Sequence, residues 1–189
     1  VVVVGDVGRA AFYHTGDEAM TDAAVDQLRA RGVEDIVLVA SSPKVATQTY
    51  GLPAVPRLRF SKKWTRERCD RRLASLAAML KRGELPEGDR RTVIEAVADA
   101  DAVLIAGGGN LRSEHRYMIY ERLAIARVAR HYGKPVFVTS QTVGPMLDEA
   151  DEPLVKEIAD TALLFGAREP HTAALVRALV DEPATVVQT

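Results

Sequence analysis

Short, almost continuously apolar runs alternate along the chain with longer segments in which apolar and polar positions are mixed. The short runs are rich in β-branched residues, which is typical of strands buried on both faces of a parallel sheet. They predict strands over residues 1–4, 35–40, 102–107, 135–140, 162–167 and 184–187. The longer segments carry apolar residues three and four positions apart, as one face of a helix requires. They predict helices over residues 16–32, 66–83, 89–100, 117–133 and 168–180.

Strands and helices alternate throughout, and parallel strands joined in this way have right-handed crossovers. We therefore predict an α/β fold with a doubly wound, mostly parallel, Rossmann-like sheet. With 189 residues, of which 47% are hydrophobic, the chain is long enough for one compact domain over residues 1–189. No internal repeat or low-complexity linker divides it.

The net charge and the cysteine content argue against two classes of protein, nucleic-acid binders and disulfide-stabilised domains. The formal net charge is -1, so the total charge gives no indication of nucleic-acid binding, and we expect none. The single cysteine, Cys69, excludes an internal disulfide framework. It lies in a helical pattern, where we expect it to pack in one apolar stripe with Leu73, Leu76, Ala77 and Leu80.

The sequences at the two ends of the chain indicate where the protein is located and whether the chain is a fragment. The opening run of four valines is too short for a signal peptide or a membrane span, so we expect a cytoplasmic protein. The chain begins without methionine and ends in a predicted strand with no helix after it. We therefore expect a fragment of a longer protein.

Positive charge is concentrated in residues 57–72, around Phe60 and Trp64. The cations at its start are Arg57, Arg59, Lys62, Lys63, Arg66 and Arg68. This segment suits an acidic polymer or an anionic membrane surface. It also leads into an amphipathic helix that needs a polar side, so we favour a solvated face.

Polar, glycine-rich segments follow four of the predicted strands. In an open α/β sheet, ligands bind outside the carboxyl ends of the strands, so these segments are the first place to look for chemistry. They read "GDVGRAAFYHTGDEAM", "GGGNLRSEH", "QTVGP" and "REPHT". We expect all four to converge on one edge of the sheet.

Three successive glycines, Gly107, Gly108 and Gly109, follow the strand predicted over residues 102–107. Their amides could form an anion-binding concavity that leads into a helix. Alternatively, glycine supplies a positive φ angle in a tight turn without any ligand. We favour the ligand site, because directed donors follow at once in Asn110, Arg112 and His115.

The familiar nucleotide motifs are missing. The first loop has no G-x-G-x-x-G, and Ser41 and Ser42 follow the second strand where an NAD site would have an acidic residue. No G-x-x-x-x-G-K-[ST] occurs either. A dehydrogenase and a P-loop ATPase are both disfavoured.

Asp17 and Glu18 lie at a predicted helix start, in "TGDEAM". Acidic side chains at this place commonly cap the helix and complement its dipole. In a functional interpretation, one carboxylate is the general base for a sugar hydroxyl, and His14 is a proton donor or an anion contact. Neither interpretation excludes the other.

Further candidates follow two later strands. Gln141 and Thr142 either belong to a turn or bind a sugar hydroxyl. Arg168 lies at a predicted helix start, where its charge opposes the dipole, so we expect an anion or a carboxylate nearby. Glu169 or Asp17 could be that carboxylate, and a structural ion pair and a substrate contact both stay open.

Taken in order, four segments resemble the polysaccharide pyruvyl transferase family: "HTGDEAM", "LIAGGGNL", "VTSQTVGP" and "GAREPHTAALV". The resemblance spans nearly the whole chain. Members of that family have a two-domain fold similar to the GT-B glycosyltransferases. They transfer the enolpyruvyl carbon of phosphoenolpyruvate to a sugar as a pyruvate ketal.

The resemblance implies that this chain is the N-terminal half, and that much of the phosphoenolpyruvate site lies in a C-terminal domain. Asp17 or Glu18 would act on the acceptor hydroxyls, while residues 107–110 and Gln141 would shape the interdomain cleft. Gly16 would be a further substrate-binding residue. The acceptor would be a sugar of a polysaccharide or a lipid-linked oligosaccharide, and we expect neither a metal nor a cofactor beside the donor. The first segment departs from the family pattern, because it lacks the asparagine that is common just before the glycine-aspartate pair.

Two other functions stay open. One is a GT-B glycosyltransferase that uses a nucleotide sugar. The other is a non-catalytic domain that binds a glycan or a protein partner through the basic segment, residues 57–72.

Overall fold

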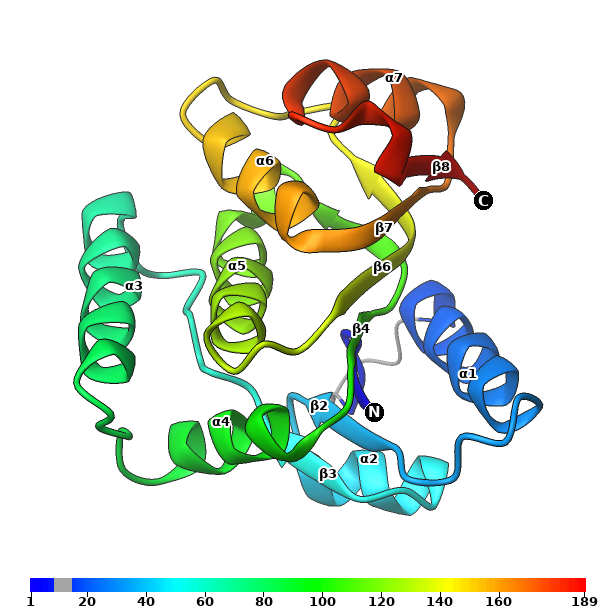
Figure 1. Ribbon diagram of the computed structural model, residues 1–189, viewed down its shortest axis with the longest axis vertical. Helices are drawn as coiled ribbons and strands as arrows, with labels where there is room; N and C mark the ends of the chain where they lie inside the picture. The colour runs from blue at the N-terminus through cyan, green and yellow to red at the C-terminus, as the bar shows by residue number, and fades with distance from the viewer. Residues whose placement is uncertain (9–14) are drawn as a thin grey trace.

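The computed structural model describes residues 1–8 and 15–189, which form a parallel sheet with helices on both faces (Figure 1). The strands are β1 (Val2–Val4), β2 (Val37–Ala40), β3 (Ala54–Pro56), β4 (Val103–Ile105), β5 (Gly108–Leu111), β6 (Val136–Val143), β7 (Ala162–Ala167) and β8 (Val186–Gln188). Their order in the sheet is β3-β2-β1-β4-β6-β7-β8, with β5 paired to β6. This is the doubly wound, Rossmann-like α/β fold that the sequence predicted.

Seven α-helices are present in the described residues. They are α1 (Thr15–Arg29), α2 (Pro43–Tyr50), α3 (Arg66–Lys81), α4 (Asp89–Asp99), α5 (Arg116–His131), α6 (Glu152–Thr161) and α7 (Pro170–Leu179). Two short 3-10 turns are η1 (Ser113–His115) and η2 (Pro183–Thr185). No described helix has both the length and the apolar character that crossing a membrane requires.

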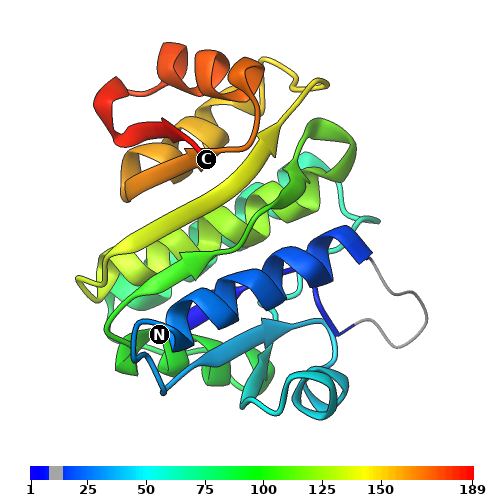
Figure 2. The same cartoon turned by 90° about the vertical axis from the view of Figure 1, so that its right-hand side faces the viewer.

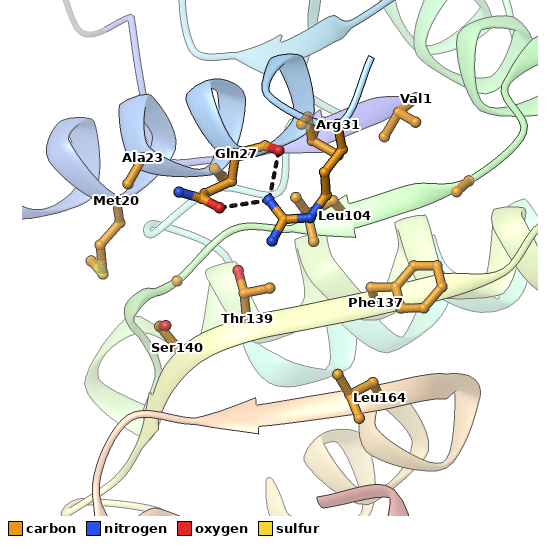
Figure 3. Close-up of a pocket in the computed structure, with 14 residues that line it drawn as sticks. Val1, Met20, Ala23, Gln27, Arg31, Leu104, Phe137, Thr139, Ser140 and Leu164 are labelled. Carbon is orange, nitrogen blue, oxygen red and sulfur yellow. Dashed lines mark hydrogen bonds between the residues drawn. The ribbon is translucent and has the colours of Figure 1, made fainter. Parts of the chain in front are cut away.

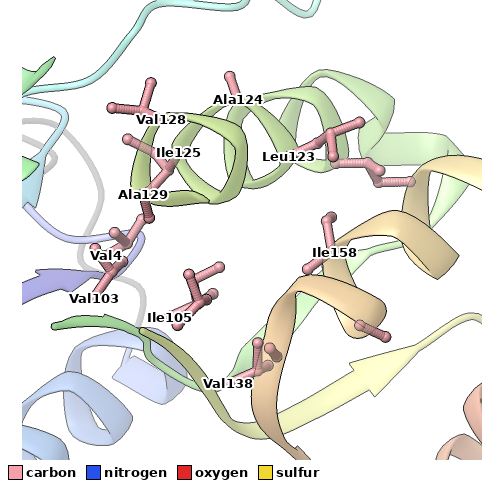
Figure 4. Close-up of a cluster of buried hydrophobic side chains, with 14 of the residues drawn as sticks. Val4, Val103, Ile105, Leu123, Ala124, Ile125, Val128, Ala129, Val138 and Ile158 are labelled. Atoms are coloured by element: carbon pink, nitrogen blue, oxygen red, sulfur yellow. The ribbon is translucent and has the colours of Figure 1, made fainter. Parts of the chain in front are cut away.

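Side chains alternate between the two faces along each central strand, and each face has its own core. Val4, Ile105 and Val138 pack with α5 and α6 in the larger core, which also includes residues of α3, α4 and α7 (Figure 4). Val3 and Leu104 face the other way, into a smaller core with α1 and α2. Figure 2 shows α1 in front of the sheet and α5 behind it. Burial on both faces explains why the strands read as continuous apolar runs.

One half of the α1 face is left without a covering helix. Among the described helices, only α1 and α2 contribute to the core on that face. Leu164 of β7 is therefore 39% exposed, and Phe137 of β6 is only partly buried. We call this region the open face of the sheet.

The predicted helix over residues 66–83 forms as α3, with one correction to its apolar stripe. Cys69, Leu73, Leu76 and Leu80 are buried, so Cys69 has the packing role that the sequence predicted. Ala77 is exposed instead, because it lies beside the stripe and not on it. Thr65 caps the helix by accepting the N–H of Arg68.

Candidate functional site

The strands β1 and β4 lie side by side where the sheet changes direction. From β1 the chain proceeds to β2 and β3 on one side, and from β4 to β6, β7 and β8 on the other. Their last paired residues are Val4 and Ile105, so the segments that follow leave the same edge of the sheet. Ligands of open α/β sheets bind at such a switch point.

A cavity of about 350 Å³ lies at this edge, and we name it the switch-point pocket. Its lining combines carboxylates, cations and neutral hydrogen-bonding groups that are far apart in the sequence. The lining residues are Asp6, Asp17, Lys62, Gly109, Asn110, Arg112, His115 and Tyr117. The structure therefore brings Asp17 together with four residues of the segment 109–115, whereas the predicted segments that contain Gln141 and Arg168 contribute no residue to this lining.

The glycine triplet has a different structure from the one predicted. Gly108 and Gly109 are the first two residues of β5, which pairs with β6, and Gly107 directly precedes them. None of the three has a positive φ angle, and the following α-helix begins only at Arg116. The expected helix entrance is therefore wrong, and so is the alternative of a left-handed tight turn.

Close packing explains the first two glycines instead. A Cβ atom on Gly107 would lie 2.7 Å from the carbonyl oxygen of Ser140. A Cβ atom on Gly108 would lie 2.8 Å from both Nδ2 of Asn110 and Oδ1 of Asp17. Glycine at position 108 therefore allows both side chains to approach the backbone of β5 closely.

Asn110 is the clearest indication of a ligand in the switch-point pocket. Its side chain is 6% exposed, and its Nδ2 atom has no hydrogen-bond partner among the described residues. Leaving a buried donor without a partner costs about 1–3 kcal/mol. A bound acceptor oxygen would remove that cost. This agrees with the prediction from the sequence that Asn110 donates a hydrogen bond to a ligand.

Arg112 and His115 form a basic pair at the rim of the pocket. Nη2 of Arg112 lies 2.9 Å from Nε2 of His115, and Nη1 lies 3.5 Å from a carboxylate oxygen of Glu114. Burial lowers the pKa of His115, and the positive charges of Arg112 and Lys62 lower it further. Because arginine only donates, Nε2 of the neutral ring accepts and Nδ1 carries the proton. Nδ1 is buried without a partner among the described residues.

Asp6 was not predicted from the sequence as a site residue. It lies in a buried charge network. It is 4% exposed, and its Oδ1 atom lies 3.7 Å from Nη1 of Arg57. Nη2 of Arg57 lies 3.7 Å from Oε2 of Glu121, which also accepts the N–H of Phe60 at 2.9 Å. The only signal for Asp6 was its position directly after the first strand, where the ligand edge was expected.

Arg122 adds a second buried cation behind this network. It is 1% exposed, and burial lowers its pKa to about 10, aided by Arg57 and opposed by Asp6 and Glu121. The guanidinium therefore stays protonated at neutral pH.

Glu18, the second acidic candidate, does not line the switch-point pocket. It is 4% exposed and accepts hydrogen bonds from the N–H of Gly8 and the hydroxyl of Tyr50. These contacts hold α1 against the segment that follows β1. Of the two acidic candidates, only Asp17 lines the switch-point pocket.

Two other predicted residues contribute less to the site. His14 lies outside the described residues. Gly16 is exposed in the first turn of α1, and a Cβ atom added to it would have no neighbour within 4 Å. It does not line the pocket, whereas Asp17 beside it does.

Gln141 and Thr142 lie near the pocket but make internal contacts. Gln141 is fully buried, and its Nε2 atom donates to the carbonyl oxygen of Ala106 at 2.8 Å. Its Oε1 atom has no partner among the described residues. Thr142 donates to Oε1 of Glu169 at 2.7 Å. The two residues connect β6 to its neighbours, and neither lines the switch-point pocket.

Arg168 forms the ion pair that one of its two interpretations predicted. Its Nε atom lies 2.7 Å from Oε1 of Glu169, and a second nitrogen contacts the sulfur of Met20 at 3.9 Å. Burial by itself raises the pKa of Glu169, but hydrogen bonds from Thr142, Arg168 and Thr172 together lower it. A substrate contact by Arg168, which is 45% exposed, stays a prediction.

The basic segment, residues 57–72, does not form one solvated face. Phe60 is buried and stacks on Tyr120 with the ring centres 5.8 Å apart. Arg66 pairs with the buried Asp151 at 2.9 Å. Other side chains of the segment are exposed, among them Arg59, Lys62, Lys63 and Arg68. The segment therefore anchors one wall of the site and presents cations beside it.

A larger cavity of about 560 Å³ lies on the open face, between α1 and the strands β6 and β7 (Figure 3). Its apolar lining includes Ala23 of α1, Leu104, Phe137 and Leu164. No acidic residue is among the residues that line it in the described part of the chain. It therefore offers apolar surface but no carboxylate for proton transfer.

Comparison with known proteins adds the family. A family model described as "Polysaccharide pyruvyl transferase" matches residues 14–189. The chain belongs to the polysaccharide pyruvyl transferase family. No curated protein and no solved structure matches it. The family is one of transferases with a sugar acceptor, and the match covers every residue that lines the switch-point pocket except Asp6.

Proposed function

We propose that this chain is part of an enzyme that transfers pyruvate from phosphoenolpyruvate to a sugar of a polysaccharide or lipid-linked oligosaccharide as a ketal. The observation that carries the proposal is the composition of the switch-point pocket in a member of this family. Asp6 and Asp17 share one cavity with Lys62, Arg112 and the neutral His115. Such a pocket can bind anionic groups and activate a hydroxyl in the same place.

The reaction needs two acceptor hydroxyls and one proton transfer to carbon. Protonation of the methylene carbon of phosphoenolpyruvate makes its neighbouring carbon electrophilic, and the first hydroxyl adds there. The second hydroxyl then replaces phosphate at the same carbon, so that both oxygens form the ketal. One hydroxyl proton balances the new methyl group, and the other leaves with the phosphate.

In this scheme Asp17 is the general base for an acceptor hydroxyl. Arg112 binds negative charge on the donor, and Nδ1–H of His115 donates a hydrogen bond to it. Asn110 supplies a donor from the floor of the pocket. The family resemblance implies that a second domain completes the donor site, and a cytoplasmic location stays a prediction.

The test uses the full-length protein with phosphoenolpyruvate and a panel of saccharides, and measures phosphate release and ketal formation. We expect Asp17→Asn to lower kcat/KM by roughly 100-fold or more, as loss of a general base does. Asp22→Asn is the matched control, because Asp22 is an exposed residue of the same helix. Equal transfer by both variants would contradict the role of Asp17. Turnover of a nucleotide sugar in place of phosphoenolpyruvate would favour a glycosyltransferase.

A further inference from the structure

A second cavity adjoins the switch-point pocket. Its volume is about 330 Å³, and we name it the basic pocket. It shares Lys62 and Tyr117 with the switch-point pocket, so the two pockets lie next to each other. Among the described residues, its lining includes Arg57, Arg59 and Lys62 but no acidic side chain. The lining therefore changes from mixed charge in the switch-point pocket to positive charge in the basic pocket.

Two of these cations are available to a ligand. Arg59 pairs with Asp89, but the two side chains are 64% and 51% exposed, and such a pair contributes little. A ligand anion can therefore replace the carboxylate. Lys62 is exposed, and no carboxylate of the described residues lies within ion-pair distance of its ammonium group.

The backbone of this wall is also unusual. Arg59 has a φ angle of 66°, in the left-handed region that residues other than glycine rarely adopt. Strain of this kind persists where the surrounding structure holds it, and it concentrates at binding sites. Here the flanking residues are fixed by burial, because Leu58 and Phe60 both belong to the larger core. The strained conformation places Arg59 at the pocket and not in the core.

Arg57 connects the two pockets. Its guanidinium lies 3.7 Å from Asp6, donates to the hydroxyl oxygen of Ser41 at 3.3 Å, and lies 5.8 Å from the centre of the Tyr117 ring. Its Nε atom has no hydrogen-bond partner among the described residues. The cation is thus oriented from both sides, at the boundary between the two pockets.

We propose that the basic pocket binds a negatively charged group of the acceptor, a phosphate or a carboxylate attached to the saccharide. The hydroxyls of the same acceptor then reach Asp17 in the switch-point pocket. This inference rests on the proposed function and specifies an anionic acceptor class. The proposal places the reacting carbon of the donor in the switch-point pocket, because that carbon must lie beside a carboxylate base and the basic pocket has none among the described residues.

The test compares three probes with the full-length protein: glucose, glucose 1-phosphate and glucuronic acid. Calorimetry measures their binding, so the readout does not depend on turnover. We expect glucose 1-phosphate, glucuronic acid or both to bind at least about 10-fold more tightly than glucose, as charge-assisted hydrogen bonds provide. The stronger of the two charged probes identifies the anionic group. Equal binding of all three sugars would overturn the inference.

Arg59→Gly removes the charge and relieves the left-handed strain, so the fold should persist. We expect it to abolish the preference for the charged sugar while leaving the affinity for phosphoenolpyruvate within about 2-fold. The control is Arg82→Ala, which removes another exposed arginine paired with a carboxylate, Glu84. Loss of phosphoenolpyruvate affinity in Arg59→Gly, or no change with any probe, would overturn the inference. Absence of pyruvyl transfer with the charge preference intact would contradict the proposed function alone.

Discussion

Nη2 of Arg112 lies 2.9 Å from Nε2 of His115, and this contact determines the state of the imidazole. An arginine can only donate, so the ring must offer a lone pair there and stay neutral. A protonated His115 would place two positive charges against each other. The pair is therefore expected to be sensitive to pH just below neutrality.

This relationship gives a prediction about stability and pH. The pKa of His115 is lowered from 6.5, so between that value and its lower folded value the unfolded chain binds more protons. We expect the free energy of unfolding to have its full value above pH 6.5. It should fall as the pH drops from 6.5 through the lower pKa of His115 in the folded protein. His115→Gln should reduce this dependence, measured by urea unfolding at a series of pH values. An identical pH profile in the variant would show that other groups cause it.

The first two residues of the glycine triplet should respond differently to alanine. At position 107 the new methyl group would meet backbone atoms of residues 139 and 140, which cannot move easily. We expect Gly107→Ala to lower the free energy of unfolding by about 1–3 kcal/mol, as overpacking does.

At position 108 the atoms nearest to the methyl group would be the ends of the Asp17 and Asn110 side chains. We expect Gly108→Ala to keep its Tm near that of the unmodified protein but to lower kcat/KM about 10-fold or more, since the displaced groups lie in the pocket. Gly109→Ala has open space and serves as the control for Tm. Full activity in Gly108→Ala would show that the positions of the Asp17 and Asn110 side chains are not important for catalysis.

Glu18 and Asp17 are neighbours with opposite expected behaviour. Glu18→Gln weakens the contacts to Gly8 and Tyr50, so the free energy of unfolding should fall by about 1–3 kcal/mol. At a temperature where the variant is folded, its kcat should stay close to that of the unmodified enzyme. Asp17→Asn should show the reverse. A large loss of kcat in a stable Glu18→Gln protein would restore Glu18 as a catalytic candidate.

Cys69 should be protected from thiol reagents. It is 2% exposed, and burial raises the pKa of its thiol, so little thiolate is accessible. We expect alkylation by iodoacetamide to be slow in buffer and complete in denaturant, as followed by mass spectrometry. Cys69→Ser would serve as the control for reaction at other side chains. Rapid labelling of the folded protein would contradict the packing role.

The elements that the sequence predicted best are those with a strong hydrophobic pattern. All six apolar runs contain strands, because the central strands are buried on both faces and therefore consist mostly of apolar residues. The helices α2 and α6 and the strand β3 were not predicted. Strand β3 has three residues and ends in Pro56, which is tolerated because β3 lies at the edge of the sheet. Strand β5 was not predicted either, since glycine has no pattern of its own.

The site was predicted less completely than the fold. Asp17, Asn110 and Arg112 were found because they lie in polar segments next to strand ends. Asp6 was missed because one aspartate after an apolar run has no periodicity to identify it. Tyr117 was missed for another reason, since its place in the lining depends on how α5 packs and not on its neighbours in sequence.

The pairing of β1 with β4 has a consequence for the order of events during folding. These strands are about one hundred residues apart in the chain, and the parts of the switch-point pocket extend from Asp6 to Tyr117. Bringing such distant segments together is slow compared with forming a helix. During synthesis, the N-terminal carboxylates are therefore made long before the cations that face them. The pocket can recognise a ligand only after the chain has closed over this interval, so a nascent chain without β4 has no binding site.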